Sequence, residues 1–273
     1  MKKITKKLLP IYVVAQPKGG VGKTTVAQQV LPAVLKINPE NANKKIVIFE
    51  FDDNNNKRFN YSTESNIINT TFKINNADNI LEGLSLDILS ADDLIVIVDC
   101  GGSGDAHKVL EALNNNDFYD CHYCIPTLAG DDPQSLIALA QKIKDLDPNG
   151  EMNYFLNKCK ELNGNTITED FWQIYGDKEL EELTDNTEIL MIDNVYYVPE
   201  INIFSKLAMF QKSIYDIVQE TNAFESKDIR EVKLEWSKLG EEGRKLNSMY
   251  KFGKICRTGF NNFLKYNKLE KGI

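Results

Sequence analysis

The sequence is poor in several residue types that would otherwise point to a function. It has 2 histidines, 2 tryptophans and 5 cysteines in 273 residues, and the cysteines follow no disulfide or zinc-binding spacing. Such scattered cysteines suit a reducing compartment and argue against a disulfide scaffold. Only Cys121 and Cys124 form a C-x-x-C pair, in "DCHYCIPT". We interpret that pair as part of a core strand, because the segment alternates and no second ligand pair accompanies it.

Long apolar runs are also absent. No stretch approaches the roughly 20 apolar residues that span a bilayer. The run in "MKKITKKLLPIYVV" is broken by Pro10 and continues into a strand-like segment. We therefore interpret the N-terminus as the approach to a first strand and not as a signal peptide. These features predict a cytoplasmic protein.

Positive charge is scarce overall but concentrated at one end. The formal net charge is −8. From Lys227 to Ile273 there are 12 Lys and Arg against 6 Asp and Glu, so residues 1–226 carry a net −14. A basic segment on an acidic body suggests contact with nucleic acid or an anionic membrane. A solvated basic helix without a partner is the alternative.

Short apolar runs alternate with helical patterns along most of the chain. The strand-like runs are Ile11 to Gln16, Lys45 to Phe51, Leu94 to Cys100, Cys121 to Thr127, Met152 to Asn157 and a weaker one near Val195. Helical patterns follow from Lys23, Ala106, Pro133 and Phe204. This alternation predicts an α/β fold with a mostly parallel, twisted sheet flanked by helices. The Asn-rich segment from Asn54 to Asp93 is predicted to be loops, with one short element around Leu84 to Leu89.

Beyond Ser226 the pattern becomes helical throughout. One apolar stripe runs from Ile229 to Leu246, and a second includes Phe252, Phe260, Phe263 and Leu264. The sequence therefore predicts a domain over residues 1–225 and a basic helical C-terminal extension over residues 226–273. The stripes are expected to pack on the body or on each other.

The stretch "VVAQPKGGVGKTTVAQQV" carries the clearest chemistry. A glycine-rich turn between a strand and a helix directs backbone N–H groups toward phosphate oxygens. The predicted nucleotide-binding residues of this loop are Gly19, Gly20, Val21, Gly22, Lys23, Thr24 and Thr25. Lys23 is expected to reach the β- and γ-phosphates, and the Thr24 hydroxyl to bind Mg²⁺. Position 17 is proline, so the usual G-x-x-x-x-G-K-[ST] pattern is not met, and Lys18 is an additional lysine at the mouth of the loop.

The string "KGGVGKTT" resembles the deviant P-loop of the ParA/MinD family of ATPases, whose signature is the early lysine. The resemblance implies a P-loop NTPase fold, ATP and Mg²⁺ as ligands, and an ATP-dependent homodimer. It further implies that Lys18 acts in trans on the nucleotide of the opposing subunit, as an arginine finger does. The resemblance extends from about Ile11 to Ile217, and the segment between Asp52 and Asp99 looks shorter than in typical partition ATPases.

Four acidic residues lie at or just beyond the carboxyl ends of two predicted strands. By resemblance, Asp52 orients or deprotonates the attacking water, with Asp53 as the alternative, and Glu50 helps to organise the magnesium site. Asp99 ends a buried strand, where P-loop enzymes hold a magnesium-bound water. The chain departs from the family in having Glu50 in place of an aspartate, in lacking a Pro-Gln after Asp52, and in having glycines after Asp99.

Later matches to the family are looser. Asn157, after a strand, and Pro199, in "NVYYVPE", match positions that contact the base. The segment "CIPTLAGDDPQSL" resembles one that often lies at the dimer face.

Three functions remain open from the sequence. The first is a nucleoid-associated ATPase that partitions a plasmid or other mobile DNA, stimulated by a ParB-like activator. Its DNA contacts are expected from Lys251, Lys254, Arg257, Lys265 and Lys268, since no additional domain precedes the first strand. The second is a MinD-like ATPase at a membrane or on another cargo, with lipid contacts from Phe260, Phe263 and Leu264. The third is a metabolic synthetase such as dethiobiotin synthetase, against which Lys18 argues.

Overall fold

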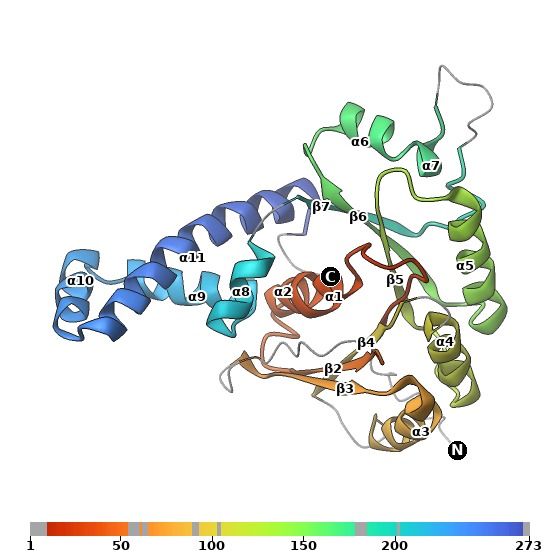
Figure 1. Ribbon diagram of the computed structural model, residues 1–273, viewed down its shortest axis with the longest axis horizontal. Helices are drawn as coiled ribbons and strands as arrows, with labels where there is room; N and C mark the ends of the chain where they lie inside the picture. Colours follow the sequence, from red (N-terminus) through yellow and green to blue (C-terminus); the bar gives the residue numbers. More distant parts are fainter. Residues whose placement is uncertain are drawn as a thin grey trace.

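The computed structural model describes residues 10–53, 61, 65–88, 93–102, 105–177, 185–200 and 203–269 (Figure 1). Its centre is a seven-stranded sheet in the order β3-β2-β4-β1-β5-β6-β7, and every neighbouring pair is parallel. The strands are β1 (Ile11–Val14), β2 (Lys45–Phe51), β3 (Ile67–Phe72), β4 (Leu94–Cys100), β5 (His122–Thr127), β6 (Glu151–Cys159) and β7 (Asn194–Pro199). The predicted parallel α/β architecture is therefore confirmed.

Helices cover both faces of the sheet, which explains why its central strands are apolar along their length. All 4 residues of β1 are buried, as are all residues of β4 except Leu94. One face packs against α3 (Ala77–Ile88), α4 (Asp105–Asn115) and α5 (Pro133–Leu146). The other packs against α2 (Leu31–Ile37), α9 (Ile214–Glu225) and α11 (Glu241–Tyr266).

The remaining short helices connect these layers. They are α1 (Lys23–Thr25), the π-helical turn η1 (Val26–Val30), α6 (Gly164–Asp170), α7 (Trp172–Tyr175) and α8 (Phe204–Phe210). The helix predicted from Lys23 is thus built from α1, η1 and α2 in succession.

The expectation of loops and one short element between Asn54 and Asp93 was wrong. The described part of that segment contains β3, the 3-10 turn η3 (Ile74–Asn76) and α3, which is 12 residues long. β3 lies at the edge of the sheet and is only partly buried, so it lacks the continuous apolar run of a central strand. Leu81 and Leu84 are buried and pack α3 on the sheet.

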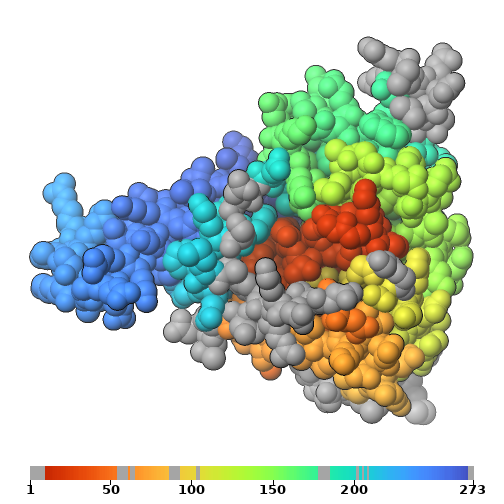
Figure 2. Space-filling view, viewed as in Figure 1, coloured from red at the N-terminus to blue at the C-terminus, as the bar shows by residue number. Residues whose placement is uncertain are grey.

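The C-terminal helices form an arm that projects from the body (Figures 1 and 2). Its helices are α9, α10 (Ile229–Lys238) and α11. At Gly253, α11 approaches α9 so closely that a Cβ there would lie 1.9 Å from Thr221 Oγ1. Beyond the end of α11, the Asn267 side chain accepts from Tyr197 N at 2.7 Å and donates to Tyr197 O at 3.0 Å. Asn267 therefore satisfies backbone groups at the outer edge of β7, where a further strand would otherwise bind.

The outer part of the arm has a small core of its own. Val232, Trp236 and Tyr250 are buried there, and Phe224 packs edge-on against Trp236 with ring centroids 4.9 Å apart. Leu239 is the exception in the first apolar stripe, at 48% exposed. Among the described helices, none has the length and apolarity needed to cross a membrane.

The membrane alternative required Phe260, Phe263 and Leu264 to contact lipid. None of these side chains is more than 8% exposed, and all three belong to the apolar cluster between α11 and the sheet. They are core residues, so their assignment as lipid contacts was wrong.

Candidate functional site

The predicted loop and the predicted acids meet in one cavity at the carboxyl ends of β1, β2 and β4. Its volume is about 450 Å³. It is lined by Gly19, Gly20, Gly22, Lys23, Thr24, Thr25, Glu50, Phe51, Asp52, Asp99, Cys100, Gly101, Gly102 and Asp105. Ligands of open α/β sheets bind at this edge, because the loops that follow the strands converge there.

The path of the glycine loop depends on residues without a side chain. Gly20 and Gly22 have φ values of 76° and 97°, which other L-residues rarely adopt. At Gly22 space is also lacking, because a Cβ would lie 1.9 Å from Asn157 Nδ2. Glycine meets both constraints, and the resulting tight turn can present backbone N–H groups to a phosphate.

Lys23 occupies the inside of this loop. It is 9% exposed, and its Nζ donates a 2.8 Å hydrogen bond to the Lys18 carbonyl oxygen. Burial lowers the pKa of Lys23, while the acids Asp99 and Asp52 oppose this shift. The ammonium is therefore held at the centre of the cavity, where an anionic ligand would stabilise its charge.

Glu50 and Asp99 form a buried pair of carboxyl groups beside Lys23. They lie opposite each other in the register of β2 and β4 and are 2% and 3% exposed. Burial, assisted by the Glu50 charge, raises the pKa of Asp99 to about 8, while a hydrogen bond with the Thr24 side chain acts in the opposite direction. Thr71 of β3 donates a 2.9 Å hydrogen bond to Glu50 Oε2 and so fixes that carboxyl group.

These oxygen ligands fit Mg²⁺ bound together with a nucleotide. Mg²⁺ is commonly held by one or two carboxylates, water and the substrate's phosphates. Within the described residues there is no group of three or more His, Cys, Asp or Glu side chains that could hold a metal ion by itself. We conclude that Thr24, Glu50 and Asp99 can supply a partial coordination shell that phosphate oxygens would complete.

The two aspartates that follow β2 have different surroundings. Asp52 lines the cavity. Asp53 Oδ1 accepts a 3.1 Å hydrogen bond from the backbone N of Ile74, at the start of η3. Of the two, Asp52 is thus the one that faces the cavity.

Lys18 points away from the cavity that its neighbours line. Its side chain is 54% exposed, and its Nζ lies 2.5 Å from Asp131 Oδ1. Asp131 is 2% exposed and its other carboxylate oxygen accepts a 2.8 Å hydrogen bond from Leu128 N. Asp131 was not predicted as a partner of Lys18; in "GDDP" it stands next to the acidic residue that precedes proline and has the pattern of a helix N-cap. Asp132 performs that capping for α5.

Asn157 and Pro199, the predicted base contacts, lie outside the lining of the cavity. Asn157 is 5% exposed, its Nδ2 donates to Val21 O at 2.8 Å, and its Oδ1 accepts from Lys158 N at 2.9 Å. The Asn157 amide therefore stabilises the glycine loop through its hydrogen bond to the Val21 carbonyl oxygen. Pro199 lines a small apolar crevice with Phe204 and Phe260. Contact of either residue with a base stays a prediction.

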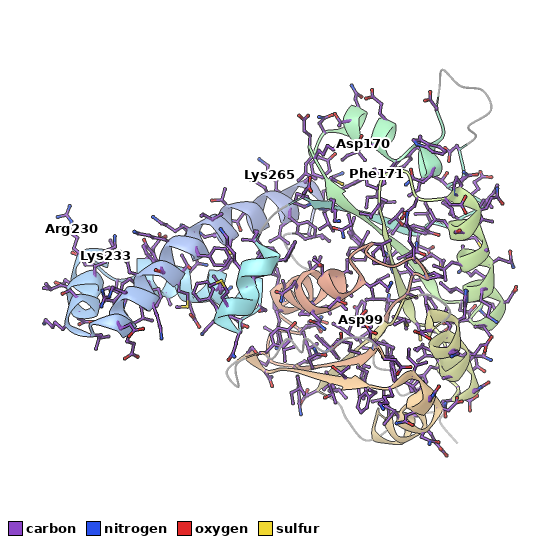
Figure 3. The ribbon with its side chains drawn as sticks, viewed as in Figure 1. Asp99, Asp170, Phe171, Arg230, Lys233 and Lys265 are labelled. Atoms are coloured by element: carbon purple, nitrogen blue, oxygen red, sulfur yellow. The ribbon has the colours of Figure 1, made fainter. Side chains whose placement is uncertain are left out.

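Four of the five predicted DNA-binding cations are exposed, namely Lys251, Lys254, Lys265 and Lys268. The fifth, Arg257, donates from Nη1 to Glu225 at 2.6 Å and to Asn222 at 3.0 Å, so it also joins α11 to α9. Figure 3 shows Lys265 near the body and Arg230 and Lys233 at the outer end of the arm.

No protein-family model and no curated protein sequence matched the chain. Among solved structures, the chain is similar to a nucleotide-binding protein from Archaeoglobus fulgidus in complex with ADP, at 15% identity and a TM-score of 0.45, over 74% of this chain and 87% of that one. It is also similar to the signal recognition particle 54 kDa protein from Aeropyrum pernix in complex with GDP, at 15% identity and a TM-score of 0.40, over 71% and 42%. A third is a LAO/AO transport system kinase, at 11% identity and a TM-score of 0.41, over 97% and 68%. The chain has an α/β fold with a seven-stranded parallel sheet flanked by helices, and the glycine loop, Lys23 and the acids line one cavity at the carboxyl ends of its strands.

Proposed function

We propose that the chain is an ATP-dependent dimerising switch of the ParA/MinD type that binds DNA in its ATP state and thereby partitions or positions a DNA cargo. The observation that carries this proposal is the position of Lys18. Lys23 already supplies the cation inside the loop. Lys18 lies directly beside the loop, yet its ammonium group is directed outward and half-exposed. A second cation in this place is suited to the phosphates of an opposing subunit.

The cavity provides the groups that Mg²⁺ and ATP require. Backbone N–H groups between Gly19 and Thr25 and the Lys23 ammonium would hold the phosphates. Thr24, Glu50 and Asp99 would hold Mg²⁺, which neutralises charge on the transferring phosphoryl group when bound. Asp52 faces the same space and can accept a hydrogen bond from an attacking water. The activity that follows is hydrolysis of ATP to ADP and phosphate.

The ion pair with Asp131 limits how Lys18 could act on the nucleotide of another subunit. Because the ammonium is bound to a buried carboxylate, it must leave Asp131 before it can reach another subunit. Because Asp131 is buried, breaking this ion pair costs more than the roughly 1 kcal/mol or less of an exposed surface pair. The triphosphate of an opposing subunit offers a larger negative charge, so ATP would favour the release of Lys18 and ADP would favour it less.

The arm offers a surface that suits the phosphates of DNA. Between Gly243 and Leu269 the chain has 7 Lys and Arg and no Asp or Glu. We define the basic face of α11 as its exposed cations at helical spacing, which are Arg244, Lys251, Lys254 and Lys265. They extend over roughly 30 Å of helix. Contacts of this kind bind DNA without reading its sequence.

The dimer, the DNA and an activator protein complete the proposed cycle. ATP would close two chains into a homodimer that carries two basic faces to the nucleoid. A ParB-like protein that marks the cargo would stimulate hydrolysis, and loss of the γ-phosphate would release the dimer.

The substitution Lys18→Ala tests the proposal. The expected result is that ATP still binds with an affinity within about threefold of wild type, because Lys23 and the loop remain. Dimerisation with a non-hydrolysable ATP analogue should be lost, as measured by size-exclusion chromatography with light scattering. Lys245→Ala, which removes a lysine that is 76% exposed on the arm, is the matched control and should dimerise normally. A Lys18→Ala protein that dimerises as well as wild type would contradict the proposal.

A further inference from the structure

A second cavity opens toward the other end of the sheet, at the amino-terminal parts of the strands. Its volume is about 210 Å³. Tyr12 of β1, His122 of β5 and Glu151 of β6 form one row across the sheet in the strand register, and Phe155 and Tyr196 form a second row. All five side chains line the cavity. The nucleotide site, by contrast, lies at the carboxyl ends of the strands, so the two cavities are separate.

The walls of this cavity are mainly aromatic. The rings of Tyr12 and His122 are stacked with centroids 4.9 Å apart. The rings of Phe155 and Tyr196 also have centroids 4.9 Å apart and are tilted by 37°. Aromatic faces carry partial negative charge, so a cation beside several of them is attracted to each.

The charged group at the cavity is a carboxylate. Glu151 is 37% exposed, and it accepts from His122 Nδ1 at 2.8 Å and from Asn194 Nδ2 at 2.7 Å. No lysine or arginine is among the described residues that line the cavity. Burial raises the pKa of Tyr196 to about 12, and the negative charge of Glu151 acts in the same direction. The electrostatic potential inside the cavity therefore favours a positive charge.

The Tyr12 hydroxyl is a polar group that an occupant could reach. Tyr12 is 7% exposed and lines the cavity, but its hydroxyl is not fully enclosed by protein. A polar group in the cavity could therefore form a hydrogen bond with it.

We propose that this cavity binds a small organic cation with a methylated ammonium group. Aromatic walls with a nearby carboxylate are the combination that recognises such groups. The cavity volume is several times the roughly 30 Å³ that one water molecule occupies. A polar substituent on the cation would lie within the same space as the Tyr12 hydroxyl and the Asn153 side chain, which also lines the cavity.

Titration of the full-length protein with choline, followed by calorimetry, tests the proposal. The uncharged carbon isostere of choline, in which a quaternary carbon replaces the nitrogen, has the same shape and is the matched control ligand. We expect choline to bind with a Kd on the order of 1 mM or lower and the isostere to bind about tenfold more weakly. Equal binding of the two, or no binding of choline, would overturn the proposal.

Two substitutions locate the site. Tyr196→Leu removes one aromatic wall and Glu151→Gln removes the charge while keeping the shape, and each should weaken choline binding about tenfold. Tyr196→Phe keeps the ring and should bind choline normally, as should Tyr119→Leu, which changes a tyrosine that is 45% exposed elsewhere. Unchanged ATP affinity shows that each variant is folded. Retention of choline binding in both Tyr196→Leu and Glu151→Gln would overturn the proposal.

Discussion

The chemistry of the nucleotide cavity depends on carboxyl groups that have little contact with water. Asp99 is buried next to Glu50, and its pKa of about 8 reflects the cost of ionising a carboxyl group there. The arrangement that makes ionisation of Asp99 unfavourable also places hard oxygen ligands next to Lys23. This arrangement would suit the metal and the polyanion that we propose as ligands, at the expense of stability.

This cost predicts a pH dependence of folding. The folded-state pKa of Asp99 is raised above its unfolded value of 3.8, so the folded protein binds the additional proton. The free energy of unfolding should then fall as the pH rises from about 4 to about 8, by up to about 1.4 kcal/mol per pH unit. Urea unfolding of the nucleotide-free protein at about pH 5 and about pH 7 measures the slope. Asp99→Asn should reduce the slope, while the exposed change Glu235→Gln should not. An equal slope in wild type and Asp99→Asn would contradict this account.

The sequence was sufficient to predict the residues whose place follows from a motif. Lys23 and Thr24 belong to one contiguous loop, and Glu50 and Asp99 lie near the ends of apolar strands. It could not predict partners from distant segments. Asp131 meets Lys18 across 113 positions, and Asn157 meets Val21 across 136. Such pairs depend on which strands become neighbours in the sheet, which local pattern does not encode.

Among the secondary-structure elements, strand β3 was not predicted, because its pairing also depends on segments that are distant in the sequence. β4 and β2 were predictable because both of their faces are covered and their apolar runs are nearly continuous. β3 is an edge strand whose sequence, IINTTF, shows neither a continuous apolar run nor a regular alternation, and its partner β2 lies more than 15 residues earlier in the chain. Its pairing with β2 therefore depends on the folded arrangement of the chain and not on local sequence. The helical stripes of the arm were predictable from spacing alone, since burial follows the period of the helix.

The arm depends on a close approach between α10 and α11, and Gly243 permits it. A Cβ at this position would lie 1.7 Å from the carbonyl oxygen of Trp236. Because that atom belongs to the backbone, Gly243→Ala should force the helices apart and lower the free energy of unfolding by about 1–3 kcal/mol. Urea unfolding followed by Trp fluorescence measures the change.

Gly83→Ala is the matched control for that substitution. Gly83 is exposed in α3, and an added Cβ would meet nothing within 4 Å. This change should stabilise the protein by about 0.5–1 kcal/mol, because alanine favours a helix over glycine. If Gly243→Ala stabilised the protein to the same extent, the close packing of α10 on α11 would be wrong.

At the scale of the whole molecule, charge and shape are divided between two parts. The body is acidic and holds the nucleotide cavity, and the arm carries the basic face of α11 away from it (Figure 2). In the proposed DNA-binding switch, this division would separate the nucleotide from the DNA phosphates and so keep like charges apart. It also means that a dimer closed at the cavity would present two arms, and two weak contacts to one duplex bind far more tightly than either alone.

We propose that ATP, through Lys18, controls the binding of DNA to the basic face of α11. The most direct measurement is the fluorescence anisotropy of a labelled duplex of arbitrary sequence, titrated with protein in Mg²⁺ with ATP, with ADP or without nucleotide. Three variants are compared with the wild-type protein. They are Lys18→Ala, a triple Gln variant of Lys251, Lys254 and Lys265, and a control triple Gln variant of the exposed body residues Lys45, Lys108 and Lys160.

We expect binding with ATP alone, and its loss in Lys18→Ala. The triple arm variant should bind more weakly and should reduce the slope of log affinity against log salt concentration by about 3, while the body variant should behave as wild type. Binding that is independent of nucleotide or of Lys18, or a salt slope unchanged in the arm variant, would contradict the account.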